Sequence, residues 1–355
     1  MSQGNELAYE QFKNIDLSDS FFDSLKADYA EFPTWFQKKA EDRAYIFKRD
    51  QGGIDGFLYL KIEEGALNDV SPPLPPARRI KVGTFKLNAI GTKLGERFLK
   101  KVFDHAIHHD IALIYVTVFE KHEALLRLFE RHGFIRIARK KSKNGEELVL
   151  QKDFKAPYVN PVASYPSIPM GRNRCYLISL YPEWHTRLLP DSILRTESQD
   201  LVQDVSHTNS IHKVYLAAMK GTESLRPNDV IVIYRPAPKG GRPWFESVAT
   251  TIGVVEESRH IDSFQSAEDF KAYCSPYSIF TIKELDEFWK YKRYPNIFKF
   301  TYNVALKKRP NRARLVEDVG LAKDAYWGFM PLSFDQLHHI AQLGEIDESL
   351  IVNQA

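Results

Sequence analysis

A proline-rich segment near the middle of the chain sets the strongest limit on how this sequence can fold. The stretch KDFKAPYVNPVASYPSIPMGRNR shows neither helical nor strand periodicity. Because proline lacks an amide donor and fixes φ, such a stretch predicts an extended spacer. The whole chain has 355 residues, more than one average core accommodates. We therefore predict a first domain at 1–154, a proline-rich linker at 155–171 and a second domain at 172–355.

Charge is nearly balanced along the chain. The formal net charge is +3, and residues 1–155 hold 26 Lys and Arg against 23 Asp and Glu. The rest of the chain is neutral. Any nucleic-acid contact must therefore come from a local patch of positive charge and not from the field of the whole protein.

The expected compartment is the cytoplasm. The two cysteines, Cys175 and Cys274, form no CxxC motif, which excludes a disulfide scaffold and favours a reducing environment. No uninterrupted apolar stretch reaches about 18 residues, so no transmembrane helix is expected. The N-terminal stretch MSQGNELAYEQF is polar and acidic, unlike a signal peptide.

Before the proline segment, strands and helices mix in a way that predicts an α/β fold. Helical spacing over 19–41 is broken at Pro33, and strands are predicted at 43–50 and 54–64. The loop SPPLPPARR leads into a predicted strand at 80–90. The later elements are a helix at 93–110, a strand at 111–119, a helix at 123–133 and a hairpin at 134–154 that turns at Asn144-Gly145.

The stretch GTKLGERFLKK, which begins at Gly91, places two glycines where the helix at 93–110 starts. The first amides of a helix lack intrahelical partners, and the helix dipole favours an anion there. Lys93, Arg97 and the two lysines at 100 and 101 add positive charge. The alternative is a tight turn at Gly91 and a close helix contact at Gly95, with no ligand.

This region resembles the GNAT superfamily of N-acetyltransferases. In that family a strand–loop–helix with the pattern Q/R-x-x-G-x-G/A holds the diphosphate of acetyl-CoA. Gly95 matches the last small position, whereas Lys93 replaces the first glycine and Ile90 replaces the Gln or Arg. The resemblance implies that acetyl-CoA is the co-substrate. The implied contacts are Phe85, Lys86 and Leu87 along the pantetheine arm, and Lys93, Leu94, Gly95, Glu96 and Arg97 at the diphosphate.

A second signature supports the resemblance, which covers residues 1–153. The family pattern N-x-x-A-x-x-L-Y-E-K-x-G-F is similar to HEALLRLFERHGF, which begins at His122. Phe129 stands where the family has a tyrosine that protonates the thiolate, and phenylalanine cannot donate a proton. The candidate bases are Glu120 and His122, whose alternatives are a solvated loop charge and a residue at a helix start. Tyr115 and Thr117 could line the cleft or pack in the core.

A histidine cluster late in the helix at 93–110 invites a metal hypothesis. His105 and His109 are one helical turn apart, as in metal-binding helices, and His108 lies between them. No nearby third ligand is evident, and a helix C-terminus also favours positive charge. We predict no metal site.

After the proline segment the sequence is also mixed α/β. Strands are predicted within 173–185, 226–237, 247–261 and 296–310, and helices at 266–274, 281–291 and 333–344, the last capped by Ser333. Residues 209–217 fit a strand or a helix.

The stretches CYLISLYPE, LRPNDVIVIYR and ATTIGVVEESR resemble the PUA-like superfamily, which includes ASCH and EVE domains. The resemblance implies a small β-barrel with flanking helices that binds RNA, such as tRNA, or a modified nucleotide. Aromatic rings stack on bases, and clustered Lys and Arg neutralise phosphates. The alternatives are core aromatics and a solvated basic loop. The implied contacts are Trp184, Ser210, His212, Lys213, Tyr234, Lys307, Lys308 and Arg309, with Tyr181, Trp244, Arg312 and Arg314 as further candidates.

Together these patterns predict an acetyl-CoA-dependent N-acetyltransferase whose second domain guides it to an RNA or nucleotide-like amine. Tethering a reader to a transferase raises the local concentration of the reader's target. One alternative is a protein without catalysis that senses acyl-CoA and binds nucleic acid. Another is a transferase for proteins or small molecules. The sequence names neither the acceptor nor the oligomeric state.

Overall fold

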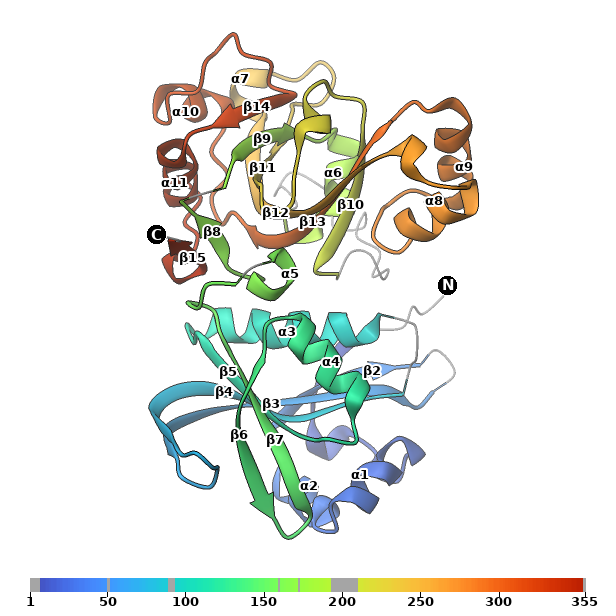
Figure 1. Cartoon of the computed structure of the whole chain (residues 1–355), viewed down its shortest axis with the longest axis vertical. Coiled ribbons are helices and arrows are strands. Elements are labelled where there is room, and N and C mark those ends of the chain that lie inside the picture. The colour runs from blue at the N-terminus through green and yellow to red at the C-terminus, as the bar shows by residue number, and fades with distance from the viewer. Residues whose placement is uncertain are drawn as a thin grey trace. The chain divides into compact units, whose positions relative to one another are not determined.

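The computed structural model shows a mixed α/β protein made of two compact units, Met1–Asp153 and Phe154–Ala355 (Figure 1). This confirms the α/β class predicted from the sequence. Each unit is a mixed sheet flanked by helices. The structure describes residues 7–49, 52–88, 93–158, 160–171, 173–192 and 210–353.

The first unit is built on a seven-stranded sheet in the order β1-β2-β3-β4-β5-β7-β6. Neighbouring strands of this sheet are antiparallel except β4 and β5, which are parallel because α3 crosses over between them. The strands are β1 (Leu7–Gln11), β2 (Arg43–Lys48), β3 (Ile54–Leu67), β4 (Leu74–Leu87), β5 (Leu113–Phe119), β6 (Ile135–Ser142) and β7 (Gly145–Asp153). The helices are α1 (Asp23–Asp28), α2 (Phe32–Lys38), α3 (Leu94–His108) and α4 (Glu123–Arg131).

Helices cover both faces of this sheet. On one face α2 and the short 3-10 helix Ser20–Phe22 pack aromatic rings against β3, with Phe22 and Phe36 contacting Phe57. On the other face α3 and α4 present Phe98 and Phe129 to Phe85 of β4. The apolar stripe of α3 explains this, since its residues at three- and four-residue spacing are buried.

The loop predicted at 71–79 is shorter, because β4 already begins at Leu74. β3 and β4 form a long antiparallel pair that reaches from Gly56↔Leu87 to Leu67↔Leu74. Pro75 and Pro76 are tolerated because β4 pairs with β5 only from Arg79 onward, so the prolines lie on an edge. The turn at Asn144-Gly145 is where predicted, between β6 and β7.

The extended spacer predicted at 155–171 is not extended, because this segment is folded into the second unit. It contains the helix α5 (Pro161–Ser164), capped by Asn160, and the strand β8 (Ile168–Met170), which pairs with β15 (Ile351–Asn353). The apolar side chains between the prolines cause this difference. Ile168 and Met170 are buried in the core of the second unit.

The second unit is built on a six-stranded mixed sheet in the order β10-β13-β12-β11-β9-β14. β9 and β11 are parallel, and the other pairs are antiparallel. The strands are β9 (Cys175–Ser179), β10 (His212–Ala217), β11 (Val230–Arg235), β12 (Val248–His260), β13 (Asn296–Ala305) and β14 (Phe329–Leu332). The helices are α6 (Pro182–Leu188), α7 (Pro243–Glu246), α8 (Ala267–Cys274), α9 (Ile282–Tyr291), α10 (Arg312–Glu317) and α11 (Phe334–Leu343).

Hydrophobic cores lie on both sides of this sheet. One joins the sheet to α8 and α9 through Phe270, Leu285 and Phe288, and another joins it to α10 and α11 through Leu315 and Leu337. Figure 1 shows these helix pairs at opposite sides of the unit. Ser333 caps α11 as predicted, and residues 212–217 are the strand β10. In the described part of the chain, no helix combines the length and the apolar character needed to cross a membrane.

Candidate active site

The two parallel strands of the first unit diverge partway along their length. Pairing between β4 and β5 runs from Arg79↔Leu113 to Val82↔Val116 and ends there. The next residue of β4, Gly83, is a β-bulge, because β3 pairs Tyr59 with Thr84 and Leu60 with Val82. A Cβ at Gly83 would lie 2.8 Å from the Tyr59 ring, so the bulge requires glycine. Beyond it, backbone groups of β4 on the β5 side face a gap between the strands.

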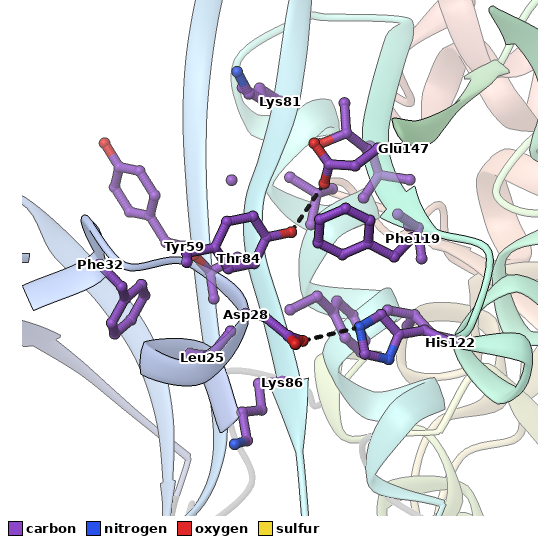
Figure 2. A pocket seen from close by; sticks show the side chains of 18 of the residues that line it. Leu25, Asp28, Phe32, Tyr59, Lys81, Thr84, Lys86, Phe119, His122 and Glu147 are labelled. Carbon is purple, nitrogen blue, oxygen red and sulfur yellow. Dashed lines mark hydrogen bonds and ion pairs between the residues drawn. The ribbon is translucent and has the colours of Figure 1, made fainter. Parts of the chain in front are cut away.

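A cleft of about 1100 Å³ occupies this gap. Its walls come from Gly83–Leu87 of β4, Val116–Phe119 of β5, the start of α4, and α1, α2, β3, β6 and β7. Figure 2 shows Lys81, Thr84, Phe119 and Glu147 around it. Its lining includes Leu87 at the end of β4 as well as Lys140 and Glu147 of the β6–β7 hairpin.

The predicted cofactor contacts on β4 all line this cleft. The ring of Phe85 packs 5.4 Å from that of Phe129. The ammonium of Lys86 donates to Ser24 and lies 5.0 Å from the Phe21 ring. These side chains are held by the protein itself, which leaves the main chain of 85–87 to meet a ligand.

The described end of the loop before α3 shows how the helix begins at the predicted anion site. Lys93 is the N-cap in a left-handed conformation, with φ 56°. Its carbonyl accepts from the amides of Glu96 and Arg97, at 3.1 and 3.2 Å. The first-turn amides of Leu94 and Gly95 have no acceptor within the helix itself. Gly91, along with Ile90, lies outside the described residues.

Three of the predicted anion contacts have other roles in the structure. The amides of Glu96 and Arg97 are engaged, and their side chains are buried, with Arg97 over the Phe47 ring at 5.1 Å. A Cβ on Gly95 would lie 3.1 Å from Leu128, which supports the close helix contact considered for this glycine. Lys100 and Lys101 both pair with one carboxylate, that of Asp104, so they add less positive charge than the sequence suggests.

The structure places the two predicted bases differently. Glu120 is exposed and is not part of the cleft wall. His122 lies in the wall, with its Nε2 3.5 Å from Asp28 Oδ2 and a side chain that is 43% exposed. Asp28 also binds Lys121, so it is shared between two cationic side chains.

A hydrogen-bonded pair in the cleft was not predicted from the sequence. The phenol of Tyr29, the residue after α1, donates to Glu147 Oε1 of β7 at 2.9 Å. The Tyr29 ring stacks on Phe119, whose strand position is directly opposite Glu147. Burial, followed by the Glu147 charge, raises the pKa of Tyr29. Alternation along β7 puts Glu147 on this face, but no sequence pattern connects it to Tyr29, 118 residues away.

The remaining candidates in this unit separate into cleft and core. Tyr115 is buried and donates to Glu63, whereas Thr117 is half-buried in the cleft wall. Phe129 is fully buried between Phe85 and Phe134.

The histidine cluster at the end of α3 is a packed group. The ring of His109 lies 4.5 Å from that of His105 and 5.0 Å from that of His108. Burial lowers the pKa of His105 to about 4. Within the described ranges, no group of three or more His, Cys, Asp or Glu could hold a metal ion.

In the second unit the predicted RNA contacts lie mostly in the interior. Ser210, His212 and Lys213 are buried, with His212 Nδ1 2.5 Å from Glu256 Oε1 and Lys213 over the Tyr302 ring. Tyr234 is buried against Trp327. Ser210 Oγ accepts from the His212 amide at 3.1 Å. Tyr181, in contrast, is 57% exposed. Trp184 is half-buried against Tyr215, Phe280 and Tyr294.

The predicted basic cluster at 307–314 is divided among separate contacts. Lys307 and Lys308 are exposed, and Lys308 pairs with Glu345 at 2.7 Å. Arg309 is half-buried and close enough to influence His185. Arg312 stacks on Trp327 at 4.5 Å, and Arg314 binds Asp318.

A surface that joins α7 to the loop before β14 combines cations with exposed rings. Lys323 lies 5.7 Å from the Trp244 ring and Arg242 5.8 Å from the Phe245 ring. Arg312 donates to the Lys323 carbonyl, and its own amide binds Ser247 next to α7, so these segments are contiguous. Phe245 and Tyr326 are 58% and 57% exposed. We call Arg242, Trp244, Phe245, Lys323 and Tyr326 the α7 surface.

Comparison with known proteins gives only weak likenesses. No protein-family profile and no curated protein sequence matches the chain. A GNAT family acetyltransferase from Elizabethkingia anophelis with acetyl-CoA bound is 12% identical over 42% of this chain and 99% of its own, at TM-score 0.30. Chaetomium thermophilum Naa20 with a bisubstrate analogue is 15% identical over 42% of this chain and 86% of its own, at TM-score 0.30. A mutant form of the ZmASCH protein from Zymomonas mobilis is 10% identical over 49% of this chain and 99% of its own, at TM-score 0.30. Likenesses of this strength assign no activity.

Proposed function

We propose that the first unit is an acetyl-CoA-dependent N-acetyltransferase. The observation that carries this proposal is the divergence of β4 and β5 beyond Val82 and Val116, with a cleft between them. Amide groups of a pantetheine arm can pair with the free strand edge of β4 as an added strand would. The diphosphate then lies at the start of α3, where the amides of Leu94 and Gly95 point.

The proposed reaction needs three contributions from the protein. It holds an amine against the thioester carbonyl, accepts the proton that the amine loses and stabilises the oxyanion. The amine enters from the side of the cleft bounded by α1, α2 and the β6–β7 hairpin, and the cofactor enters from the α3 side. Such an arrangement brings the acetyl group to the bulge at Gly83.

The test is thiol release from acetyl-CoA in the presence of an amine panel. The panel contains spermidine, free amino acids, short peptides with a free N-terminus, and total tRNA. Release that depends on an amine, with a labelled acetyl group on that amine, supports the proposal. Tight CoA binding by calorimetry without turnover of any amine would instead favour the alternative of a protein that senses acyl-CoA.

We also propose that the second unit guides the enzyme to RNA through the α7 surface. Exposed rings interleaved with cations suit single-stranded nucleic acid, because bases stack on the rings while cations neutralise phosphates. The test is filter binding of total tRNA at several salt concentrations, followed by labelling with acetyl-CoA. Affinity that falls as salt rises, with label in RNA, supports guidance. Label in proteins or small amines alone, with no retained RNA, favours a transferase for those acceptors.

A further inference from the structure

We propose that Tyr29 and Glu147 carry the proton from the amine to the departing thiolate. This inference rests on the proposed transferase function and names the residues that move its proton. The usual donor position on α4 is Phe129, which has no proton to give. The Tyr29–Glu147 pair lies in the wall of the same cleft.

The position of the pair suits this role. Glu147 is directly opposite Phe119 on the neighbouring strand β5, and the Tyr29 ring stacks on Phe119 with centroids 5.4 Å apart. Both side chains therefore reach the cleft from the face where the amine enters. Glu147 is 6% exposed, which keeps most water away from its carboxylate.

The anchoring of the α1–α2 loop holds this geometry. Glu31, two residues after Tyr29, accepts from Asn144 Nδ2 at 2.9 Å and pairs with Lys143 at 3.3 Å. Asn144 and Lys143 belong to the β6–β7 turn, three or four residues before Glu147. Two links therefore fix the loop to the hairpin, and the phenol and the carboxylate stay in register.

Burial and the neighbouring carboxylates favour the neutral form of the Tyr29 phenol. Burial, Glu147, Asp28 and Glu31 all raise the pKa of Tyr29, so it rests as a phenol. Lys140 is opposite Glu147 on β6, but its ammonium is bound to Asp69 at 2.6 Å. Lys81, another cation of the cleft wall, is 3.5 Å from Glu63. Glu147 Oε1 accepts the hydrogen bond of the Tyr29 phenol at 2.9 Å, and neither lysine competes for it.

The proton balance of the step is complete. A neutral amine attacks the thioester carbonyl, a C–N bond forms, and the nitrogen loses a proton to Glu147. The protonated carboxyl now donates to the Tyr29 oxygen, which frees the phenol hydrogen to turn toward sulfur. As the C–S bond breaks, the thiolate takes the phenol proton and Glu147 returns its own to Tyr29. The products are the amide and the free thiol, and both residues regain their starting states.

Other cleft groups fit this role less well. His122 is held by Asp28 and is 43% exposed, so its proton exchanges with solvent. Glu120 lies outside the cleft wall, and the phenol of Tyr115 is engaged by Glu63. Among the described residues that line the cleft, Tyr29 and Glu147 combine an acid and a base in one hydrogen bond.

The test compares Tyr29→Phe, Glu147→Gln and the double variant with two matched controls. Tyr45→Phe removes a half-buried phenol outside the cleft, and Glu146→Gln changes the neighbour of Glu147 that pairs with Arg139. The probe is acetyl-CoA with whichever amine of the panel the wild-type protein acetylates fastest. CoA affinity and melting temperature are measured for every variant. If Glu147→Gln does not fold, Tyr29→Phe, whose ring still stacks on Phe119, tests the relay by itself.

We expect kcat to fall about 10²- to 10³-fold in Glu147→Gln and at least about tenfold in Tyr29→Phe, with CoA affinity unchanged. The double variant should be no slower than Glu147→Gln, because the pair acts as a unit. The loss of kcat in Glu147→Gln should become smaller as pH rises toward the pKa of the substrate amine, because solvent then deprotonates the amine. Controls should stay within about twofold of wild type.

Three results would overturn the relay. If the variants are as fast as the wild-type protein, the relay is wrong but the proposed transferase function stands. If the losses of kcat multiply in the double variant and do not change with pH, the pair has a structural role and not a catalytic one. A wild-type protein that binds CoA and acetylates no amine removes the proposed function, and the relay with it.

Discussion

Val82 and Val116 are the last residues that β4 and β5 pair with each other before the strands part. Gly83 follows directly as a bulge, and the cleft begins at the same point. The bulge turns a continuous sheet into one with a gap in its middle. An extended ligand can pair with the free strand edges in that gap, which is why we propose that acetyl-CoA binds there.

Gly95 packs closely against Leu128 and lies at the proposed diphosphate site, so a larger residue should weaken both packing and CoA binding. In Gly95→Val the side chain meets Leu128, whose nearest atom is 3.1 Å from the ideal Cβ, and Leu87 at 3.5 Å. We expect a loss of about 1–3 kcal/mol in the free energy of unfolding and weaker CoA binding by calorimetry. Gly95→Ala is the control, because its small methyl only presses the flexible end of Leu128. Equal CoA affinity in both variants would contradict the placement of the diphosphate at this turn.

Restoring a tyrosine at position 129 should not raise activity. Phe129 is fully buried, and the new hydroxyl of Phe129→Tyr would lack water in the core. We expect unchanged or lower kcat and a free energy of unfolding reduced by about 1–3 kcal/mol. Thiol release and urea unfolding measure the two effects. A clear gain in kcat would show that the α4 position still reaches the thioester.

The second unit should lose stability on mild acidification because of His185. This buried imidazole is 2.7 Å from Thr250 Oγ1, and burial lowers its pKa to about 3. The unfolded chain, with a histidine pKa near 6.5, binds the proton first, so stability is present above about pH 6.5 and is lost as pH falls toward 3. The expected loss between pH 7.5 and 5 is about 2 kcal/mol.

Tryptophan fluorescence during urea unfolding measures this loss, since four of the five tryptophans are in the second unit. His185→Gln should flatten the pH dependence. His260→Gln, which changes a 52% exposed side chain, should leave it unchanged. If the free energy of unfolding of His185→Gln depends on pH as steeply as that of the wild type, His185 does not cause the acid destabilisation.

The α7 surface should provide most of the RNA affinity of the second unit. Phe245→Ala and Tyr326→Ala each remove an exposed ring, and stacking of a base is worth about 1–3 kcal/mol. Lys323→Gln should reduce the slope of log binding constant against log salt concentration by about one. Tyr291→Ala is the matched control, because Tyr291 is 63% exposed on α9 of the same unit. Filter binding that weakens equally in all variants would place the RNA elsewhere.

Much of the fold follows from local sequence patterns. The amphipathic period of α3 and the Asn144-Gly145 turn are determined by residues close in the chain, and both occur where predicted. The cap of α11 at Ser333 is equally local. The proline segment differs from its prediction because Ile168 and Met170 are buried by residues far from them in sequence.

The site was less predictable because distant residues build it. The register that gives Gly83 its bulge depends on β3, and the Tyr29–Glu147 bond joins residues that share no local pattern. The sequence predicts RNA contacts for the histidine and lysine at 212 and 213, yet strand pairing with β13 buries both. Sequence periodicity indicates which side of a strand a residue occupies, but not which partner lies there.

Hydrogen–deuterium exchange with and without CoA tests the central claim most directly. The account predicts that CoA slows exchange in peptides that cover Gly83–Leu87 of β4 and the first turn of α3. Exchange in the second unit should not change. Unaltered exchange at β4 and at the start of α3, under conditions where CoA binds, would contradict the cofactor site and with it the transferase.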